Sequence, residues 1–118
     1  MTGEIVVSRF FSLVNDRDLP KLEVLLTDNP EFYFPKTKPL LGKNQIIRFF
    51  KILFHRFPQL EFRIQRTIVQ GSKAAVHWTN RGMSRGNDPY ENEGVTILEM
   101  EDGRIRFISD FFKDTSKF

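Results

Sequence analysis

The sequence predicts an α+β domain in which a curved antiparallel sheet wraps around helices. In the first part of the chain, apolar residues recur every three or four positions, and one short β-prone run interrupts them. From residue 62 onward, apolar and polar residues alternate, and turn residues divide this part into four strands. The expected order is therefore two helices, a strand, a helix and four strands. We expect residues 1–118 to form one domain of this kind.

Three helices are expected from apolar spacing and end signals. The first covers residues 4–15. The second follows Asp18, whose side chain can accept hydrogen bonds from the first backbone N–H groups, has Pro20 in its first turn and is ended by Pro30. The third covers residues 43–57, and its apolar stripe consists of Ile46, Phe50, Leu53 and Phe57.

The strands are separated by proline, glycine and short polar runs. Residues 31–34 form the short β-prone run, Pro35 closes it, and residues 36–41 are expected to be loop. Four long strands follow, and the last two form a hairpin. The turns between these four are Gly71-Ser72, residues 82–89 and Asp102-Gly103.

Composition and charge exclude several classes of function. The chain has no cysteine, so disulfides, thiolate catalysis and zinc–cysteine sites are excluded. Its net charge of +3 comes from scattered lysines and arginines, and we expect no nucleic-acid partner. No apolar run is long enough to span a bilayer and no signal-peptide layout is evident, so we expect a cytoplasmic protein. His55 and His77 give no metal-ligand spacing, and neither a metal nor a cofactor is expected.

Five segments together carry a family resemblance. They are Phe-Tyr-Phe-Pro (32–35), Leu-Gly-Lys-Asn-Gln-Ile-Ile-Arg-Phe-Phe (41–50), Ala-Ala-Val-His-Trp-Thr (74–79), Glu-Asp-Gly-Arg-Ile (101–105) and Ser-Asp-Phe-Phe (109–112). This pattern resembles the SnoaL-like proteins of the nuclear transport factor 2-like superfamily. The resemblance implies a cone: a sheet wrapped around a long helix, with an apolar pocket open at one end. The superfamily includes polyketide cyclases, ketosteroid isomerases, epoxide hydrolases and non-catalytic binders, so fold alone does not select a function.

Asp110 is the leading candidate for chemistry because it lies in an otherwise β-prone closing strand. A buried carboxylate costs several kcal/mol unless it is paired or protonated. If Asp102-Gly103 is a two-residue turn, Val95 lies opposite Asp110. One sheet face then carries Val95, Ile97, Ile108, Asp110 and Phe112.

In that apolar setting we expect a raised pKa and a role for Asp110 as proton acceptor. The resemblance implies the same role, since the aspartate at this place in SnoaL-like cyclases acts as the base. The alternative is a structural acid that bonds a tyrosine, tryptophan or asparagine.

Trp78 and Asn80 lie two positions apart and are expected on one side of their strand. In limonene-epoxide-hydrolase-like relatives this place resembles an Arg-x-Asp pair. Trp-x-Asn lacks the cation and the second acid, so we do not expect that hydrolytic mechanism. Asn80 could polarise a carbonyl and Trp78 could wall a ring-shaped ligand. Core packing is the alternative for Trp78.

Glu31 and Tyr33 are likewise two apart, just before Pro35. Tyr33 could donate its phenol proton to a substrate carbonyl or to Asp110. Glu31 is a candidate for ligand contact, with an exposed position at the strand start as the alternative.

The outer face of the sheet is expected to hold a second subunit. His77 points opposite to Trp78, and a dimer contact is the favoured interpretation of its position. Apolar area on one sheet side is best covered by another copy of the chain. The apolar residues expected on that face are Leu98, Met100, Phe107 and Phe111.

These observations favour a protein that binds a small hydrophobic molecule in an aromatic pocket. As an enzyme it would be a cofactor-free isomerase or cyclase, with Asp110 as base and Asn80 or Tyr33 as polarising donor. The rival hypothesis is a non-catalytic binding or dimerisation module. The expected walls are Trp78, Phe50, Val95, Ile97 and Phe112.

Overall fold

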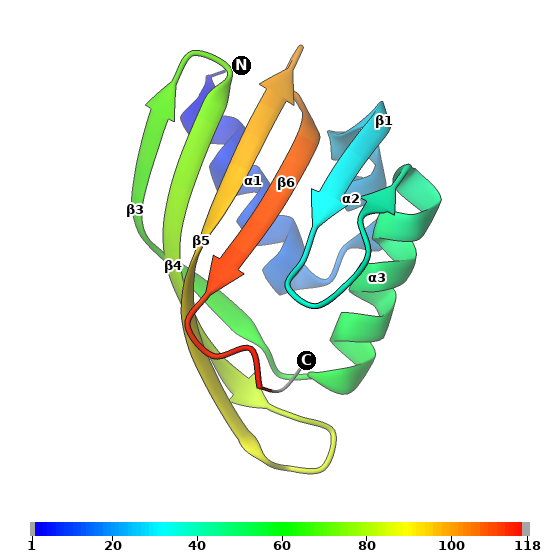
Figure 1. The fold of residues 1–118 in the computed structure, drawn as a ribbon, viewed down its shortest axis with the longest axis vertical. Helices are drawn as coiled ribbons and strands as arrows, with labels where there is room; N and C mark the ends of the chain where they lie inside the picture. Colours follow the sequence, from blue (N-terminus) through cyan, green and yellow to red (C-terminus); the bar gives the residue numbers. More distant parts are fainter. Residues whose placement is uncertain (1, 117–118) are drawn as a thin grey trace.

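The computed structural model describes residues 2–116, which form three helices and one six-stranded sheet (Figure 1). The order of the strands across the sheet is β2-β1-β6-β5-β4-β3. The elements are α1 (Gly3–Asp16), α2 (Leu19–Leu25), β1 (Leu26–Tyr33), β2 (Leu40–Leu41), α3 (Lys43–Arg56), β3 (Glu61–Gln70), β4 (Lys73–Met83), β5 (Pro89–Glu101) and β6 (Arg104–Phe112).

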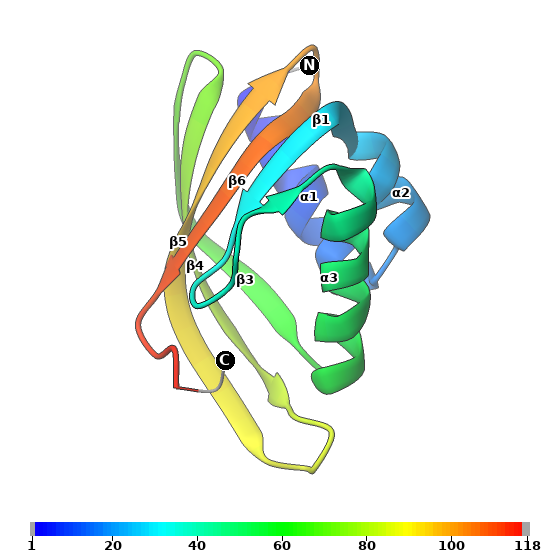
Figure 2. The same cartoon turned by 45° about the vertical axis from the view of Figure 1, so that its right-hand side comes forward.

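The sheet is curved, and α1, α2 and α3 all lie on its concave side (Figure 2). The far end of the β4–β5 hairpin bends under α3, where the backbone N–H of Arg85 donates to the carbonyl of Arg56 at 2.8 Å. The predicted α+β class, with a sheet wrapped around helices, is confirmed. No helix in residues 2–116 is long and apolar enough to cross a membrane.

Three details of the predicted sheet are wrong. The sheet is mixed, because β1 runs parallel to β6 while the other neighbouring strands pair antiparallel. Residues 26–30 belong to β1 and do not end a helix, and residues 40–41 form the short strand β2 where a loop was expected. The pairing of β1 with β6 joins distant parts of the sequence, so the local pattern carries no information about it.

The predicted helix signals are confirmed. The side chain of Asp18 accepts from the backbone N–H of Lys21 at 3.1 Å, with Pro20 in the first turn of α2. The apolar stripe of α3 is buried. Asn15 docks α1 on β3, since its side chain donates to the carbonyl of Phe62 at 2.9 Å and accepts from the N–H of Phe62 at 2.8 Å.

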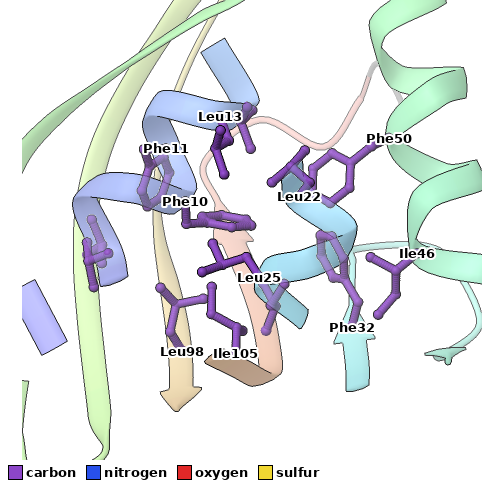
Figure 3. Packing of buried hydrophobic residues seen from close by; sticks show 14 of the residues in the cluster. Phe10, Phe11, Leu13, Leu22, Leu25, Phe32, Ile46, Phe50, Leu98 and Ile105 are labelled. Atoms are coloured by element: carbon purple, nitrogen blue, oxygen red, sulfur yellow. The ribbon is translucent and has the colours of Figure 1, made fainter. Parts of the chain in front are cut away.

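Aromatic rings fill the space between the helices and the sheet (Figure 3). Phe10 of α1 and Phe32 of β1 both meet Phe50 of α3, with ring centroids 6.2 and 5.6 Å apart. Phe32 also contacts Phe49 edge to face at 5.1 Å. Such contacts stabilise a core by about 0.5–1.5 kcal/mol per pair beyond area burial.

A β-bulge sets the register of the last hairpin. Glu101 pairs with Arg104 as predicted, but the register shifts between Glu99 and Met100, so that Asp110 pairs with Thr96. The extra residue is Arg106, which reaches the carboxylate of Glu99. Because a slip of one residue exchanges the two faces of a strand, the predicted pairing of Asp110 with Val95 is wrong.

Gly94 of β5 lies between Trp78 of β4 and Phe112 of β6, under the Trp78 ring. A Cβ there would meet the carbonyl oxygen of Phe111 at 2.4 Å and the Cζ2 atom of Trp78 at 2.7 Å. Gly94→Ala should therefore lower the free energy of unfolding by about 2 kcal/mol or more, measured by urea denaturation. Gly86→Ala is the control, because its nearest neighbour would be 3.7 Å away. Equal stability of the two variants would contradict this packing.

Candidate functional site

A small cavity lies between α1, α3 and the concave face of the sheet. Its volume is about 30 Å³, enough for one or two water molecules. The lining is apolar except for four polar side chains from β4, β5 and β6. The lining residues are Phe10, Phe11, Val14, Phe32, Phe34, Phe49, Phe50, Leu53, Leu60, Phe62, Trp78, Asn80, Tyr90, Thr96, Asp110 and Phe112.

Asp110 contributes the acid of this cavity. Its carboxyl is enclosed by apolar groups, and burial raises its pKa from the ordinary 3.8 to about 7. The hydroxyl of Thr96 donates to Oδ1 at 2.6 Å, which acts in the opposite direction and lowers the pKa. Burial is the larger effect, so both protonation states are populated at neutral pH.

Trp78 extends this contact into a chain of three side chains. Its indole Nε1–H donates to the hydroxyl oxygen of Thr96 at 2.8 Å. Trp78 and Thr96 are both almost fully buried, and the indole lies between the rings of Phe62 and Phe112. Trp78 therefore lines the cavity and also donates a hydrogen bond to the Thr96 hydroxyl.

Asn80 and Tyr90 supply the other polar groups of the lining. Asn80 is 6% exposed, and its Oδ1 atom is buried without a hydrogen-bond partner among the described residues. Such an atom costs free energy unless a ligand or water satisfies it. The hydroxyl of Tyr90 accepts from the Nδ2 atom of Asn92 at 2.9 Å, and burial raises its pKa above the ordinary 10.

Strand register separates Asn80 from Asp110. Val76 of β4, Thr96 of β5 and Asp110 of β6 lie side by side across the sheet. Asn80 lies four residues further along β4 than Val76, and Trp78, which pairs with Gly94, lies between them. Four residues of strand correspond to roughly 13 Å. The acid and the amide therefore meet opposite sides of a ligand placed over the indole.

Five of the residues expected at the site line the cavity: Asp110, Asn80, Trp78, Phe50 and Phe112. The expected placement of Val95 and Ile97 on the same face is wrong. They alternate with Thr96 and pair with Phe111 and Ser109, on the outer face, because the bulge shifts the register.

Glu31 and Tyr33 also lie away from the cavity. The phenol of Tyr33 donates to Glu31 at 2.8 Å, and its ring contacts Phe107 on the outer face. The expectation that Tyr33 reaches Asp110 or a bound carbonyl is therefore wrong. Their neighbours Phe32 and Phe34 take the inward positions of this strand.

Sequence reasoning missed Thr96 and Tyr90. Thr96 was missed because the bulge is not visible in the sequence. Tyr90 was missed for the same reason, since an unbulged hairpin places Val95 and Ile97 inward and the even-numbered residues of that strand, Tyr90 included, outward. On the outer face, Lys113 and, to a smaller extent, His77 hydrogen-bond Glu93 and lower its pKa. No group of three or more metal-ligating side chains occurs within residues 2–116.

Comparisons with known proteins agree with this architecture. The model of the SnoaL-like domain matches residues 7–108, so the chain belongs to the SnoaL-like family. A search of curated protein sequences gives no match.

Three solved structures illustrate the likeness of the fold. A protein described as a SnoaL-like polyketide cyclase from Jannaschia sp. CCS1 is 22% identical, covering 92% of this chain and 83% of that one, with a TM-score of 0.83. An LEH-like epoxide hydrolase from M. tuberculosis is 18% identical over 92% and 80%, with a TM-score of 0.80. TerC, co-crystallised with polyporic acid, is 18% identical over 92% and 88%, with a TM-score of 0.82.

Burial of Asp110 makes stability depend on pH. The folded chain holds the Asp110 proton up to about pH 7 and the unfolded chain releases it near 3.8, so stability falls as pH rises between these values. The full effect is on the order of 4 kcal/mol. Asp110→Asn should match the wild type at pH 4 and exceed its unfolding free energy at pH 8, measured by urea denaturation. A difference between the two proteins that does not change with pH would contradict the raised pKa.

Proposed function

We propose that this protein binds a small hydrophobic carbonyl compound in the cone and catalyses a cofactor-free proton transfer, as an isomerase or cyclase. The observation that carries the proposal is a carboxyl with a pKa of about 7 in an aromatic cavity. A general base works best when its pKa lies near the working pH. The polyketide cyclase among the similar structures supports the same class of chemistry.

Asp110 and Asn80 have proposed roles in the reaction, and the aromatic walls have one in binding. Asp110 takes a proton from a carbon next to the carbonyl, and Asn80 hydrogen-bonds a polar group at the opposite end of the ligand. Trp78, Phe50 and Phe112 pack against the rings of the ligand. TerC, a protein of this fold, was co-crystallised with polyporic acid.

Binding requires rearrangement of side chains. A cavity of about 30 Å³ does not hold a ring system, so some of its walls have to turn outward. Phe49, Phe62 and Phe112 line the cavity and keep part of their surface exposed. These three rings are the ones that can open the cone without unpacking the fully buried core.

The second candidate is a non-catalytic binding or dimerisation module. The small cavity favours it, as does the hydrogen bond that already engages Oδ1 of Asp110. The two candidates differ in one respect: only the enzyme accelerates loss of a proton from a bound carbonyl compound.

Proton exchange on a test ketone distinguishes them. The probe is 2-tetralone, a bicyclic ketone with acidic protons beside its carbonyl, in deuterated buffer at pH 7.5. Wild-type protein should accelerate exchange followed by NMR, and Asp110→Asn should lose about 100-fold or more of that rate. Asp88→Asn, in an exposed turn, should keep it. A wild-type rate equal to buffer, with a bound ligand found by native mass spectrometry, would favour the binding module.

We also propose that the outer face of the sheet forms a homodimer. Phe111 is 60% exposed there, and Val95 and Ile97 lie beside it on β5. Tyr33 and Phe107 extend the apolar area toward β1.

Phe111→Asp should therefore convert a dimer into a monomer of 13.9 kDa, measured by light scattering after gel filtration. Ile52→Asp is the matched control, because Ile52 on α3 is 51% exposed on another face. A monomeric wild type, or a dimer lost equally in both variants, would contradict this interface.

A further inference from the structure

The hydrogen bonds around Thr96 have a fixed direction. An indole N–H can only donate, so the oxygen of Thr96 accepts from Trp78. A hydroxyl has one proton, and the partner left for it is Oδ1 of Asp110 at 2.6 Å. The three residues form what we call the Trp78–Thr96–Asp110 relay. Its direction does not depend on the protonation state of Asp110, because Oδ1 can accept in both states.

We propose that Thr96 is the positioning residue of Asp110, and that Trp78 holds the Thr96 hydroxyl in the orientation this requires. The relay fixes Oδ1 as a hydrogen-bond acceptor and leaves Oδ2 as the atom that receives the substrate proton. No hydrogen bond from a described residue reaches Oδ2. This inference rests on the proposed proton transfer: the substrate C–H bond breaks, an O–H bond forms at Oδ2, and the electron pair stays on the substrate as an enolate.

The burial of Thr96 and Trp78 supports this arrangement. Thr96 and Trp78 are each 2% exposed, so the hydrogen bond between them is shielded from water, whereas the bond from Thr96 to Asp110 is partly buried. Gly94 makes the approach possible. It lies opposite Trp78 in the β4–β5 pair, and any side chain there would collide with the indole. The ring can therefore cross β5 and reach Thr96, its diagonal neighbour.

Few other charges act on the relay. Among the described residues that line the cavity, Tyr90 is the other titratable group, and its raised pKa keeps it neutral below pH 10. The groups facing Asp110 from α1, α3, β1 and β3 are phenylalanine, valine and leucine side chains. Asp110 therefore responds to two local influences, its burial and the hydroxyl of Thr96.

The chain contains a single tryptophan, so the indole N–H gives one resonance that reports on the relay. In ¹⁵N-labelled, substrate-free protein, this resonance should shift between pH 5 and 9 with a midpoint of about 7. Thr96→Val should abolish the shift, and the ¹³C resonance of the Asp110 carboxyl should then titrate at higher pH. Thr96→Ser keeps the hydroxyl and should restore both. Thr79→Val is the matched control, because Thr79 on β4 bonds Gln65 away from the cavity.

A full indole shift in Thr96→Val, or a carboxyl midpoint unchanged from the wild type, would overturn the relay. If that variant does not fold, Asp110→Asn and Thr96→Ser decide: loss of the shift in the first and its retention in the second support the relay, and a shift that survives Asp110→Asn rejects it.

The relay and the proposed function can fail separately. The resonance measurements need no substrate, so an intact relay without exchange on 2-tetralone rejects only the role of Asp110 as base. If exchange occurs, its pH profile should move upward in Thr96→Val and return in Thr96→Ser. An unmoved profile would reject Thr96 as the positioning residue.

Discussion

The β-bulge at Arg106 determines which side chains of the last hairpin face the interior. In an unbulged hairpin the carboxyl of Asp110 would share its face with Val95 and Ile97. One extra residue in β6 gives it Thr96 instead, and this exchanges an aliphatic neighbour for a hydroxyl that donates a hydrogen bond. Because of the bulge, the Asp110 carboxyl therefore accepts a hydrogen bond that orients it. The contact between Arg106 and Glu99 holds the extra residue on the outer face.

Two opposing contributions set the proton affinity of Asp110. Burying an ionised carboxyl costs several kcal/mol, whereas one hydrogen bond to a charged group contributes about 1.5–3 kcal/mol. Burial therefore wins, in agreement with a pKa of about 7. A carboxylate with two or three donors would stay ionised far below neutrality and would be a structural acid. With Thr96 as its one donor among residues 2–116, Asp110 remains able to take up and release a proton near pH 7.

Features encoded in neighbouring residues could be predicted from the sequence, and features that depend on distant partners could not. The local pattern predicts the cap at Asp18 and the turn before Arg104. It also predicts that Trp78 and Asn80 lie on one side of their strand, and both line the cavity. The parallel pairing of β1 with β6 arises only when remote segments meet, and the bulge, although it lies within one hairpin, is not visible in the alternation of apolar and polar residues. Tyr33 is an intermediate case. The alternation of Phe32 and Phe34 around it predicts an outward phenol once these two rings face the core, as they do in the structure.

The filled interior has a consequence for the kind of ligand that can bind. Phe34 contacts Phe32, Phe49 and Phe112 with centroids 6.1, 4.6 and 5.3 Å apart, so turning one ring outward breaks several contacts. Each lost pair costs about 0.5–1.5 kcal/mol beyond area burial. An aliphatic ligand of equal size restores the buried area but not the directional part of these contacts, whereas a flat ring restores both. Over two or three rings the difference is a few kcal/mol, a factor of about 100 or more in affinity. Under the proposed function, a cone closed by its own phenylalanines would therefore favour planar, ring-shaped ligands before any polar group takes part.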